Sequence, residues 1–325
     1  MNSKPLLLQN SIPVLAEPPH DRSFKSAVLW ASENAREIQS LAGSIGVVLI
    51  RGFEIQIAED FRAVCQAIEP DLKTYTGGDS PRTHVTDKIY TSTEYDPSLE
   101  VFLHNELSYA GWSPGLVFFG CMLPALKGGE TPIADGRQIY KSMPSEILKQ
   151  FETRGIAYLQ HLWDANGKPG IGKSWQETFE TTERNAAEAY LRQSNMTWEW
   201  TDFGIRTRAQ HPAVVHHPLT GEKCWRNQAD QWHRHYAGVK TSFGGDGDPR
   251  FDPQTAGEET LGNHVTYGDG GEIEVSDLMQ VRRVVQAAEV VFPWQAGDIM
   301  VIDNILAMHG RKPYEGPRQV LVAMA

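Results

Sequence analysis

A histidine and a glutamate stand two residues apart in His104-Asn105-Glu106, next to the apolar residues Phe102 and Leu103. In a β-strand, residues i and i+2 point to the same face, so the imidazole and the carboxylate converge while Asn105 points away. A carboxylate on such an apolar segment is costly unless a partner or a metal ion compensates its charge. Together the two side chains supply two of the three ligands of a facial triad, which binds Fe(II) and leaves positions open for oxygen and substrate.

The third ligand of such a triad has to come from elsewhere in the chain, and His309 is the candidate. It lies near the C-terminus, between apolar strand-like segments. A closed antiparallel fold can bring an early strand and a late strand together. The alternative interpretation is a hydrogen-bonded core histidine at position 104 beside a glutamate on the surface, and the residues alone leave both interpretations open.

A second cluster of metal-ligand residues lies at Asp230, His233 and His235. Asp230 and His233 share one face if this segment is helical. The surrounding sequence, RNQADQWHRHYAG, is polar and offers no apolar wall to exclude water. We therefore expect a solvated helix edge or loop near the mouth of a cavity.

Composition restricts the classes of partner. The chain has 325 residues, of which 40% are hydrophobic and 22% are charged, which is typical of a globular protein with a large core. Its 41 acidic residues outnumber its 30 basic ones, giving a formal charge of −11. A surface this negative repels phosphate, so neither nucleic acid nor an anionic membrane is expected as a partner. A small-molecule substrate fits better, and the composition indicates nothing about oligomeric state.

The three cysteines and the N-terminus bear on location. Cys65, Cys121 and Cys224 are widely spaced, which predicts neither a disulfide framework nor a zinc site and fits a reducing compartment. The N-terminal segment has only a short apolar patch, so no signal peptide is expected, and no apolar run is long enough to span a membrane. The predicted location is the cytoplasm.

Hydrophobic periodicity predicts a mainly β protein with flanking helices. An apolar stripe indicates a helix over 23–42, ended by Gly43 and Gly46, and a second helix follows at 58–68. Between them, residues 47–50 form a continuous apolar run typical of a strand buried on both faces. From Lys88 onward, short β-rich segments punctuated by Gly and Pro predict a sandwich or barrel. With no dividing linker, we expect a single domain over 1–325, with helical insertions at about 142–155, 174–194 and 276–287.

Five stretches of the chain carry a family resemblance. They are Gly46-Val47-Val48-Leu49-Ile50-Arg51-Gly52-Phe53, Tyr90-Thr91-Ser92-Thr93, His104-Asn105-Glu106-Leu107-Ser108-Tyr109, Gly128-Gly129-Glu130-Thr131, and Arg311 with Gly316-Pro317-Arg318. With these motifs, the chain resembles the taurine dioxygenase/TfdA-like superfamily of Fe(II)- and 2-oxoglutarate-dependent oxygenases. Within it, the sequence looks most similar to the clavaminate synthase-like and syringomycin-type amino-acid hydroxylases. The resemblance implies a double-stranded β-helix, the cupin-like jelly roll.

The resemblance also implies roles for five residues. His104, Glu106 and His309 would be the iron ligands. Thr131 and Arg318 would bind the cosubstrate 2-oxoglutarate, since a hydroxyl can donate to a carboxylate and a guanidinium can hold one with two parallel hydrogen bonds.

Two comparisons with related enzymes affect this assignment. Some relatives carry two arginines in the last strand, whereas here Gln319 follows Arg318, so the partner of the metal-proximal carboxylate of 2-oxoglutarate is open. Arg311 is an alternative anchor. Halogenases of related folds replace the carboxylate ligand with a small residue, so the presence of Glu106 favours oxygenation over halogenation.

The function implied is oxidation of an unactivated C–H bond, most simply hydroxylation of an amino acid or a related small metabolite. The reaction would use Fe(II), O2 and 2-oxoglutarate and release succinate and CO2. The same iron site could instead catalyse desaturation, epoxidation or cyclisation, and a non-enzymatic, metal-bearing jelly-roll binding module is the alternative from another class. Arg82 and Asn227-Gln228 either line the substrate pocket or lie on the surface.

Overall fold

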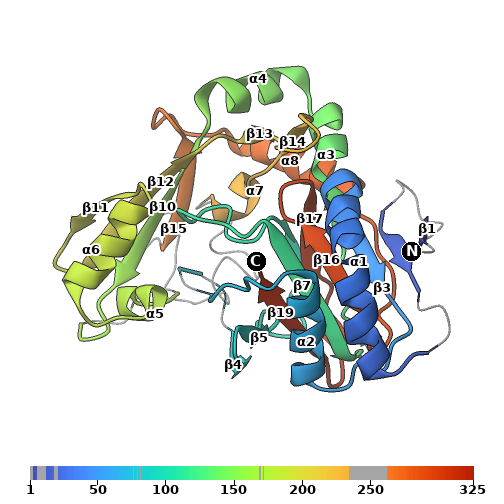
Figure 1. The fold of residues 1–325 in the computed structure, drawn as a ribbon. Coiled ribbons are helices and arrows are strands. Elements are labelled where there is room, and N and C mark those ends of the chain that lie inside the picture. Colours follow the sequence, from blue (N-terminus) through green and yellow to red (C-terminus); the bar gives the residue numbers. More distant parts are fainter. Residues whose placement is uncertain are drawn as a thin grey trace.

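The structure is a computed structural model that describes residues 3–5, 12–17, 21–75, 77–78, 80, 82–167, 170, 172–233 and 262–325. Two facing sheets form its centre, helices cover the outer face of the larger sheet, and a third sheet extends to one side (Figure 1). This arrangement is a jelly roll with flanking helices, as the sequence predicted, although its sheets do not close into a continuous barrel.

The larger sheet has eight strands, and its neighbours are antiparallel except for the parallel pair β2 and β3. In spatial order the strands are β1 (Ser3–Pro5), β2 (Val14–Ala16), β3 (Val47–Ile50), β16 (Ile299–Asp303), β7 (Leu116–Leu123), β19 (Gln319–Met324), β5 (Ile89–Thr91) and β4 (His84–Thr86). The central strands β3 and β16 are buried at every residue. A strand covered on both faces has to be apolar throughout, which explains the run at 47–50.

Helices α1 (Phe24–Ile45) and α2 (Ala58–Ile68) lie across the outer face of this sheet (Figure 1). Their apolar stripes pack on the strand residues that point outward, among them Val48, Phe118 and Val301. Gly120 in β7 allows this close packing, because a Cβ atom there would lie 2.5 Å from the ring of Phe61. Helix α1 was expected over 23–42 with Gly43 and Gly46 at its end; it continues through Gly43 to Ile45, and Gly46, whose φ of +111° suits glycine, ends it.

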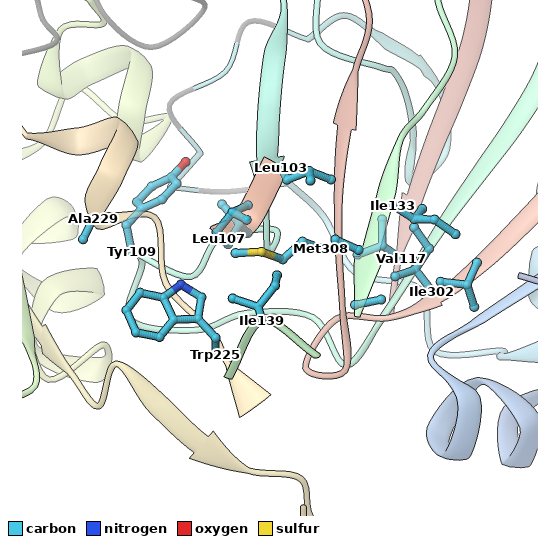
Figure 2. Packing of buried hydrophobic residues seen from close by; sticks show 14 of the residues in the cluster. Leu103, Leu107, Tyr109, Val117, Ile133, Ile139, Trp225, Ala229, Ile302 and Met308 are labelled. Atoms are coloured by element: carbon cyan, nitrogen blue, oxygen red, sulfur yellow. The ribbon is translucent and has the colours of Figure 1, made fainter. Parts of the chain in front are cut away.

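The inner face of the larger sheet packs on a three-stranded sheet. In spatial order this sheet consists of β6 (Val101–His104), β17 (Ala307–Arg311) and β9 (Ile133–Asp135). Figure 2 shows the shared core, in which Leu103 and Met308 of the smaller sheet lie near Val117 and Ile302 of the larger one. The candidate histidines therefore sit on the strands of a well-packed sandwich rather than on loops.

A third, four-stranded sheet extends to the left in Figure 1 and carries two short helices. Its strands are β11 (Thr197–Trp200), β12 (Gly204–His211), β10 (Ile156–Trp163) and β15 (Asn263–Tyr267), and its helices are α5 (Trp175–Phe179) and α6 (Arg184–Gln193). The other elements described are α3 (Gly136–Ser142), α4 (Ser145–Arg154), α7 (Ala229–Trp232), α8 (Val275–Ala287) and the strand pairs β13 (Val214–His216) with β14 (Lys223–Trp225) and β8 (Lys127–Gly128) with β18 (Tyr314–Glu315).

The predicted helical insertions are present with altered bounds. The first corresponds to α4 and the last to α8. The stretch 174–194 was expected to be one helix, but it forms the two helices α5 and α6, because Glu180 adopts a left-handed conformation and ends α5. Among the described residues, no helix combines the length and apolar character needed to cross a bilayer.

The contrast in burial between Phe118 in β7 and Leu126 in the connection after it gives a stability test. Phe118 is fully buried against α1 and α2, whereas Leu126 has 83% of its surface exposed. We expect Phe118→Ala to lower the free energy of unfolding by about 3–5 kcal/mol, because it leaves a cavity, and Leu126→Ala to change it by less than about 0.5 kcal/mol. Urea denaturation measures both values, and similar effects at the two positions would contradict this packing.

Candidate active site

His104 and His309 face each other across two neighbouring strands. Strand β6 pairs with β17 so that the two histidines are direct partners, and their ring centroids lie 4.5 Å apart. Both side chains are buried. The antiparallel pairing thus brings together two residues from distant parts of the chain, as the sequence analysis expected.

Glu106 joins this pair by a route that differs from the predicted one. Strand β6 ends at His104, so Glu106 lies in the following turn, where Leu107 has a φ of +53°. The turn still directs the carboxylate toward the histidines, and its Oε2 lies 3.4 Å from Nε2 of His309. Ligand-type atoms of His104, Glu106 and His309 all lie within 4.8 Å of one another.

Two asparagines fix the turn that carries Glu106. Asn304 lies in the tight connection between β16 and β17; its side-chain oxygen accepts from the N–H of Glu106 at 2.7 Å, and its amide nitrogen donates to the Glu106 carbonyl at 2.9 Å. In return, the Asn105 amide donates to the carbonyls of Asn304 and Ala307. We call these four hydrogen bonds the Asn105–Asn304 clamp.

Helix α7 and the residue before it hold the same segment from the other side. Gln228 donates to the Asn105 carbonyl at 2.9 Å and to the Ser108 hydroxyl at 2.8 Å, and Gln231 donates to the Leu103 carbonyl at 2.6 Å. Asn227 donates to the Ala213 carbonyl at 3.0 Å. Asn227 and Gln228 are fully buried and support main-chain turns, so of their two predicted positions the one on the surface is wrong.

Arg82 is the charged partner of Glu106. Its side chain is 2% exposed, and its NH2 group donates to Glu106 Oε2 at 2.7 Å. Burial opposes ionisation of Glu106, but the charge of Arg82 and the contact with His309 outweigh that effect and hold the pKa of this carboxyl well below its usual range. Glu106 is therefore a carboxylate at neutral pH. Of the two alternatives left open, Arg82 lies in the pocket and not on the surface.

His104 is neutral and has a defined tautomer. Burial, followed by the nearby ring of His309, lowers the pKa of His104 to about 3. Its Nδ1 lies 2.8 Å from the carbonyl oxygen of Phe102, which can only accept, so Nδ1 carries the proton. The lone pair then resides on Nε2, the arrangement typical of a metal-binding imidazole.

The donor set fits a divalent metal ion. Both ring nitrogens of His309 are buried without a hydrogen-bond partner in the described structure, a costly state that a metal ion relieves on one side. Two imidazoles and one carboxylate suit Fe(II) in particular. His104, Glu106 and His309 could therefore hold such an ion.

Thr131 and Arg318 line the same cavity as the two histidines, together with Ser92 and Phe119. Trp294 donates to the Thr131 hydroxyl oxygen at 3.1 Å, which leaves the hydroxyl proton of Thr131 to donate elsewhere. Arg318 donates to the Gly129 carbonyl and the Ser92 hydroxyl, so neither of these bonds is to a carboxylate. Burial, with the nearby charge of Arg311, lowers the pKa of Arg318 to about 10, which still leaves it charged.

Arg311, the alternative anchor, is occupied by the main chain. Its guanidinium donates four hydrogen bonds, to the carbonyls of Thr93, Tyr95, Asp96 and Leu99, at 2.8 to 3.0 Å. These bonds fasten the 93–99 loop to β17. A guanidinium engaged in this way supports the loop, which leaves Arg318 as the stronger candidate for binding a carboxylate.

The second cluster differs from its prediction. Asp230 and His233 were expected on a solvated edge, but both are buried, because α7 packs beneath α8 and against β15. Asp230 lies beside Arg282, whereas His233 gathers with His264 and Glu272, whose ligand-type atoms lie within 4.8 Å of one another. His235 lies outside the described residues.

Comparison with known proteins places this geometry in context. The model of the family described as "Taurine catabolism dioxygenase TauD, TfdA family" matches residues 8–324. The dapdiamide synthesis protein DdaC of Enterobacter agglomerans is 33% identical over 97% of this chain and 94% of its own length. A clavaminate synthase-like protein of Arabidopsis thaliana is 31% identical over 96% of this chain and 89% of its own.

Solved structures show the same fold at low identity. The PvcB protein of Pseudomonas aeruginosa superposes with a TM-score of 0.53 at 16% identity, over 96% of this chain and 84% of that one. An asparagine oxygenase in complex with Fe(II), 3-hydroxyasparagine and succinate gives a TM-score of 0.55 at 10% identity, over 93% of this chain and 83% of the other. These likenesses support the jelly-roll fold.

The Asn105–Asn304 clamp yields a test. We expect Asn304→Ala to lower the free energy of unfolding by at least about 1–3 kcal/mol, because it leaves the buried N–H and carbonyl of Glu106 without their partners. Asn185→Ala, at an exposed position in α6, serves as the matched control and should change stability by less than about 0.5 kcal/mol. Equal denaturation midpoints for the two variants would show that the clamp contributes nothing.

Proposed function

We propose that His104, Glu106 and His309 are the iron ligands of this protein. The chain belongs to the TauD/TfdA family of dioxygenases. The protein is therefore an Fe(II)- and 2-oxoglutarate-dependent oxidoreductase. The observation that carries the assignment is the convergence of two buried imidazoles and one ionised carboxylate from separate segments. As an extension of the same proposal, residues 1–325 form a single oxygenase domain.

Thr131 and Arg318 are the proposed anchors for 2-oxoglutarate. They line one cavity with His104 and His309, and the Arg318 guanidinium is half-buried and charged without a carboxylate among its hydrogen-bond partners. The distal carboxylate of the cosubstrate would meet that guanidinium and the Thr131 hydroxyl, and its other end would face the histidines. The Phe119 ring, whose centroid lies 4.9 Å from that of His309, supplies an apolar wall that restricts water.

The proposed reaction is hydroxylation of an amino acid or a related small metabolite. When bound, the iron supplies the activation of O2 that couples oxidation of the substrate to conversion of 2-oxoglutarate into succinate and CO2. The protein residues fix the positions of cosubstrate and substrate and keep Glu106 ionised through Arg82. An amino-acid substrate is supported by the relative named for dapdiamide synthesis and by the buried guanidinium of Arg82 beside the site.

Location in the cytoplasm is part of the same proposal. Cys65, Cys121 and Cys224 are all free and buried. Burial raises the pKa of each of these thiols, so none carries an appreciable thiolate at neutral pH. Unpaired, inert thiols fit a reducing compartment.

Loss of any one proposed iron ligand should abolish turnover of 2-oxoglutarate. We expect this for His104→Ala, Glu106→Ala and His309→Ala with largely unchanged circular dichroism, because each change removes a ligand from a set of three. His216→Ala, at an exposed position, is the matched control. Succinate formation and bound iron per chain are the measurements, and a ligand variant with near-native turnover and one iron per chain would refute the assignment.

The second cluster has its own test. The double variant His233→Ala/His264→Ala should retain one iron per chain and near-native 2-oxoglutarate turnover, since neither residue lies in the proposed site. Loss of iron from this folded variant would move the iron site to that cluster.

Arg318→Ala should separate cosubstrate binding from metal binding. Hydrogen bonds to a charged group are worth about 1.5–3 kcal/mol, so the Michaelis constant for 2-oxoglutarate should rise roughly 10- to 150-fold. Arg318→Lys should restore only part of the loss, because lysine keeps the charge but not the planar fork. Iron affinity should hardly change. An unaltered Michaelis constant in Arg318→Ala would place the anchor elsewhere.

A further inference from the structure

Arg82 is only partly satisfied by Glu106. Its NH2 group donates to the glutamate, but its Nε and NH1 atoms are both buried and have no hydrogen-bond partner in the described structure. A buried N–H group without an acceptor costs about 1–3 kcal/mol, and more when the group is charged. By comparison, Arg311 places its charge against four main-chain carbonyls. Arg82 therefore has two donor nitrogens beside the proposed metal site that could bind a further acceptor.

Charge balance points to an anion as the missing partner. In the proposed complex, the positive charges of Fe(II) and Arg318 are matched by Glu106 and the two carboxylates of 2-oxoglutarate. Arg311 lines the same cavity, but four main-chain carbonyls already accept from its guanidinium, so among the described cavity residues the charge of Arg82 is the one left without a counterpart. Buried charges are tolerated when they are paired and hydrogen-bonded, so one additional carboxylate would both neutralise the site and satisfy the spare donors.

Arg82 is also reachable from two sides. It lines the cavity that holds His104, His309, Thr131 and Arg318. It also lines a second, more polar cavity, whose wall includes Tyr75 and Lys173. The guanidinium carbon lies 4.5 Å from the centre of the Tyr75 ring, which holds the planar group in place through a cation–π contact. A ligand in either cavity can thus approach the same guanidinium.

We propose that Arg82 is a second carboxylate-binding residue of the active site, in addition to Arg318. The inference rests on the proposed iron site and concerns the reaction complex. The carboxylate has two possible sources, a free carboxylate on the oxidised substrate or the metal-proximal carboxylate of 2-oxoglutarate. Charge balance favours the substrate, which would then be a free acid and not a thioester or an amide.

The experiment uses the full chain loaded with saturating Co(II), which occupies an iron site without consuming the cosubstrate. Isothermal titration calorimetry gives the Kd of 2-oxoglutarate for the wild type, Arg82→Gln, Arg82→Lys and the control Arg192→Gln, whose side chain is 61% exposed in α6. The second arm titrates the twenty common L-amino acids, each paired with its carboxamide, into the Co(II)- and 2-oxoglutarate-loaded proteins.

We expect Arg82→Gln to weaken one carboxylate ligand by about 10- to 150-fold, with partial recovery in Arg82→Lys and no change in Arg192→Gln. Loss confined to 2-oxoglutarate identifies its proximal carboxylate as the source. Suppose instead that Arg82→Gln weakens the binding of one amino acid, and that the wild type binds this amino acid more tightly than the corresponding carboxamide. The carboxylate then belongs to the substrate. If Arg82→Gln fails to fold, Arg82→Lys, which keeps the charge beside Glu106, carries the comparison.

Two outcomes would overturn the inference. In one, Arg82→Gln alters only the affinity for Co(II), which reduces Arg82 to a positioning residue for Glu106. In the other, 2-oxoglutarate binding is unchanged and no amino acid shows carboxylate-dependent binding to the wild type. Failure of the proposed function looks different, because His309→Ala would then keep its Co(II) or Arg318→Gln would keep its affinity for 2-oxoglutarate.

Discussion

The Asn105–Asn304 clamp is the constraint on which the geometry of the site depends. It ties the turn after β6 to the tight connection between β16 and β17, so the segment with Glu106 and the strand with His309 cannot move independently. Because Asn304 bonds both the N–H and the carbonyl of Glu106, it fixes the main chain from which the carboxylate projects. Side-chain amides can do this because each offers donors and an acceptor at once.

The sandwich makes such a clamp possible. Strand β16 lies in the larger sheet and β17 in the smaller one, so the connection that carries Asn304 crosses from one layer to the other. The apolar core between the layers, with Leu103, Val117, Ile302 and Met308, sets their separation (Figure 2). Well-packed interiors resist deformation, so the sheets hold the two facing histidines in fixed positions.

Electrostatics gives the site its chemical character. The side chains of Glu106 and Arg82 are buried and that of Arg318 is half-buried, and two of these three side chains are cationic. A site of this kind is incomplete as a bare protein, since desolvated charges and unsatisfied donors raise its free energy. A metal ion, the cosubstrate and the substrate would each supply an opposite charge or a hydrogen-bond acceptor. Their binding would therefore lower the free energy of the site.

The sequence by itself determined the local elements and the chemically distinctive residues. Apolar periodicity was sufficient to predict α1, α2 and β3, because the spacing of apolar residues within a segment shows which face of a helix, or that both faces of a strand, are buried. The motifs around His104, Glu106, His309, Thr131 and Arg318 predicted residues that the fold brings to one cavity or its rim. Their roles as ligands and anchors remain predictions.

Only the tertiary structure decided which other residues complete the site. Asn304 reads as an ordinary turn residue, since about 200 residues separate it from its partner Glu106, and the sequence left Arg82 open between the pocket lining and the surface, with no sign of its pairing with Glu106. The polar sequence around Asp230 and His233 predicted exposure, yet packing of α7 against β15 and α8 buries both. The hydrogen-bond partners, neighbouring charges and burial of such polar residues depend on segments that are distant in the sequence. Local sequence patterns therefore cannot predict these contacts.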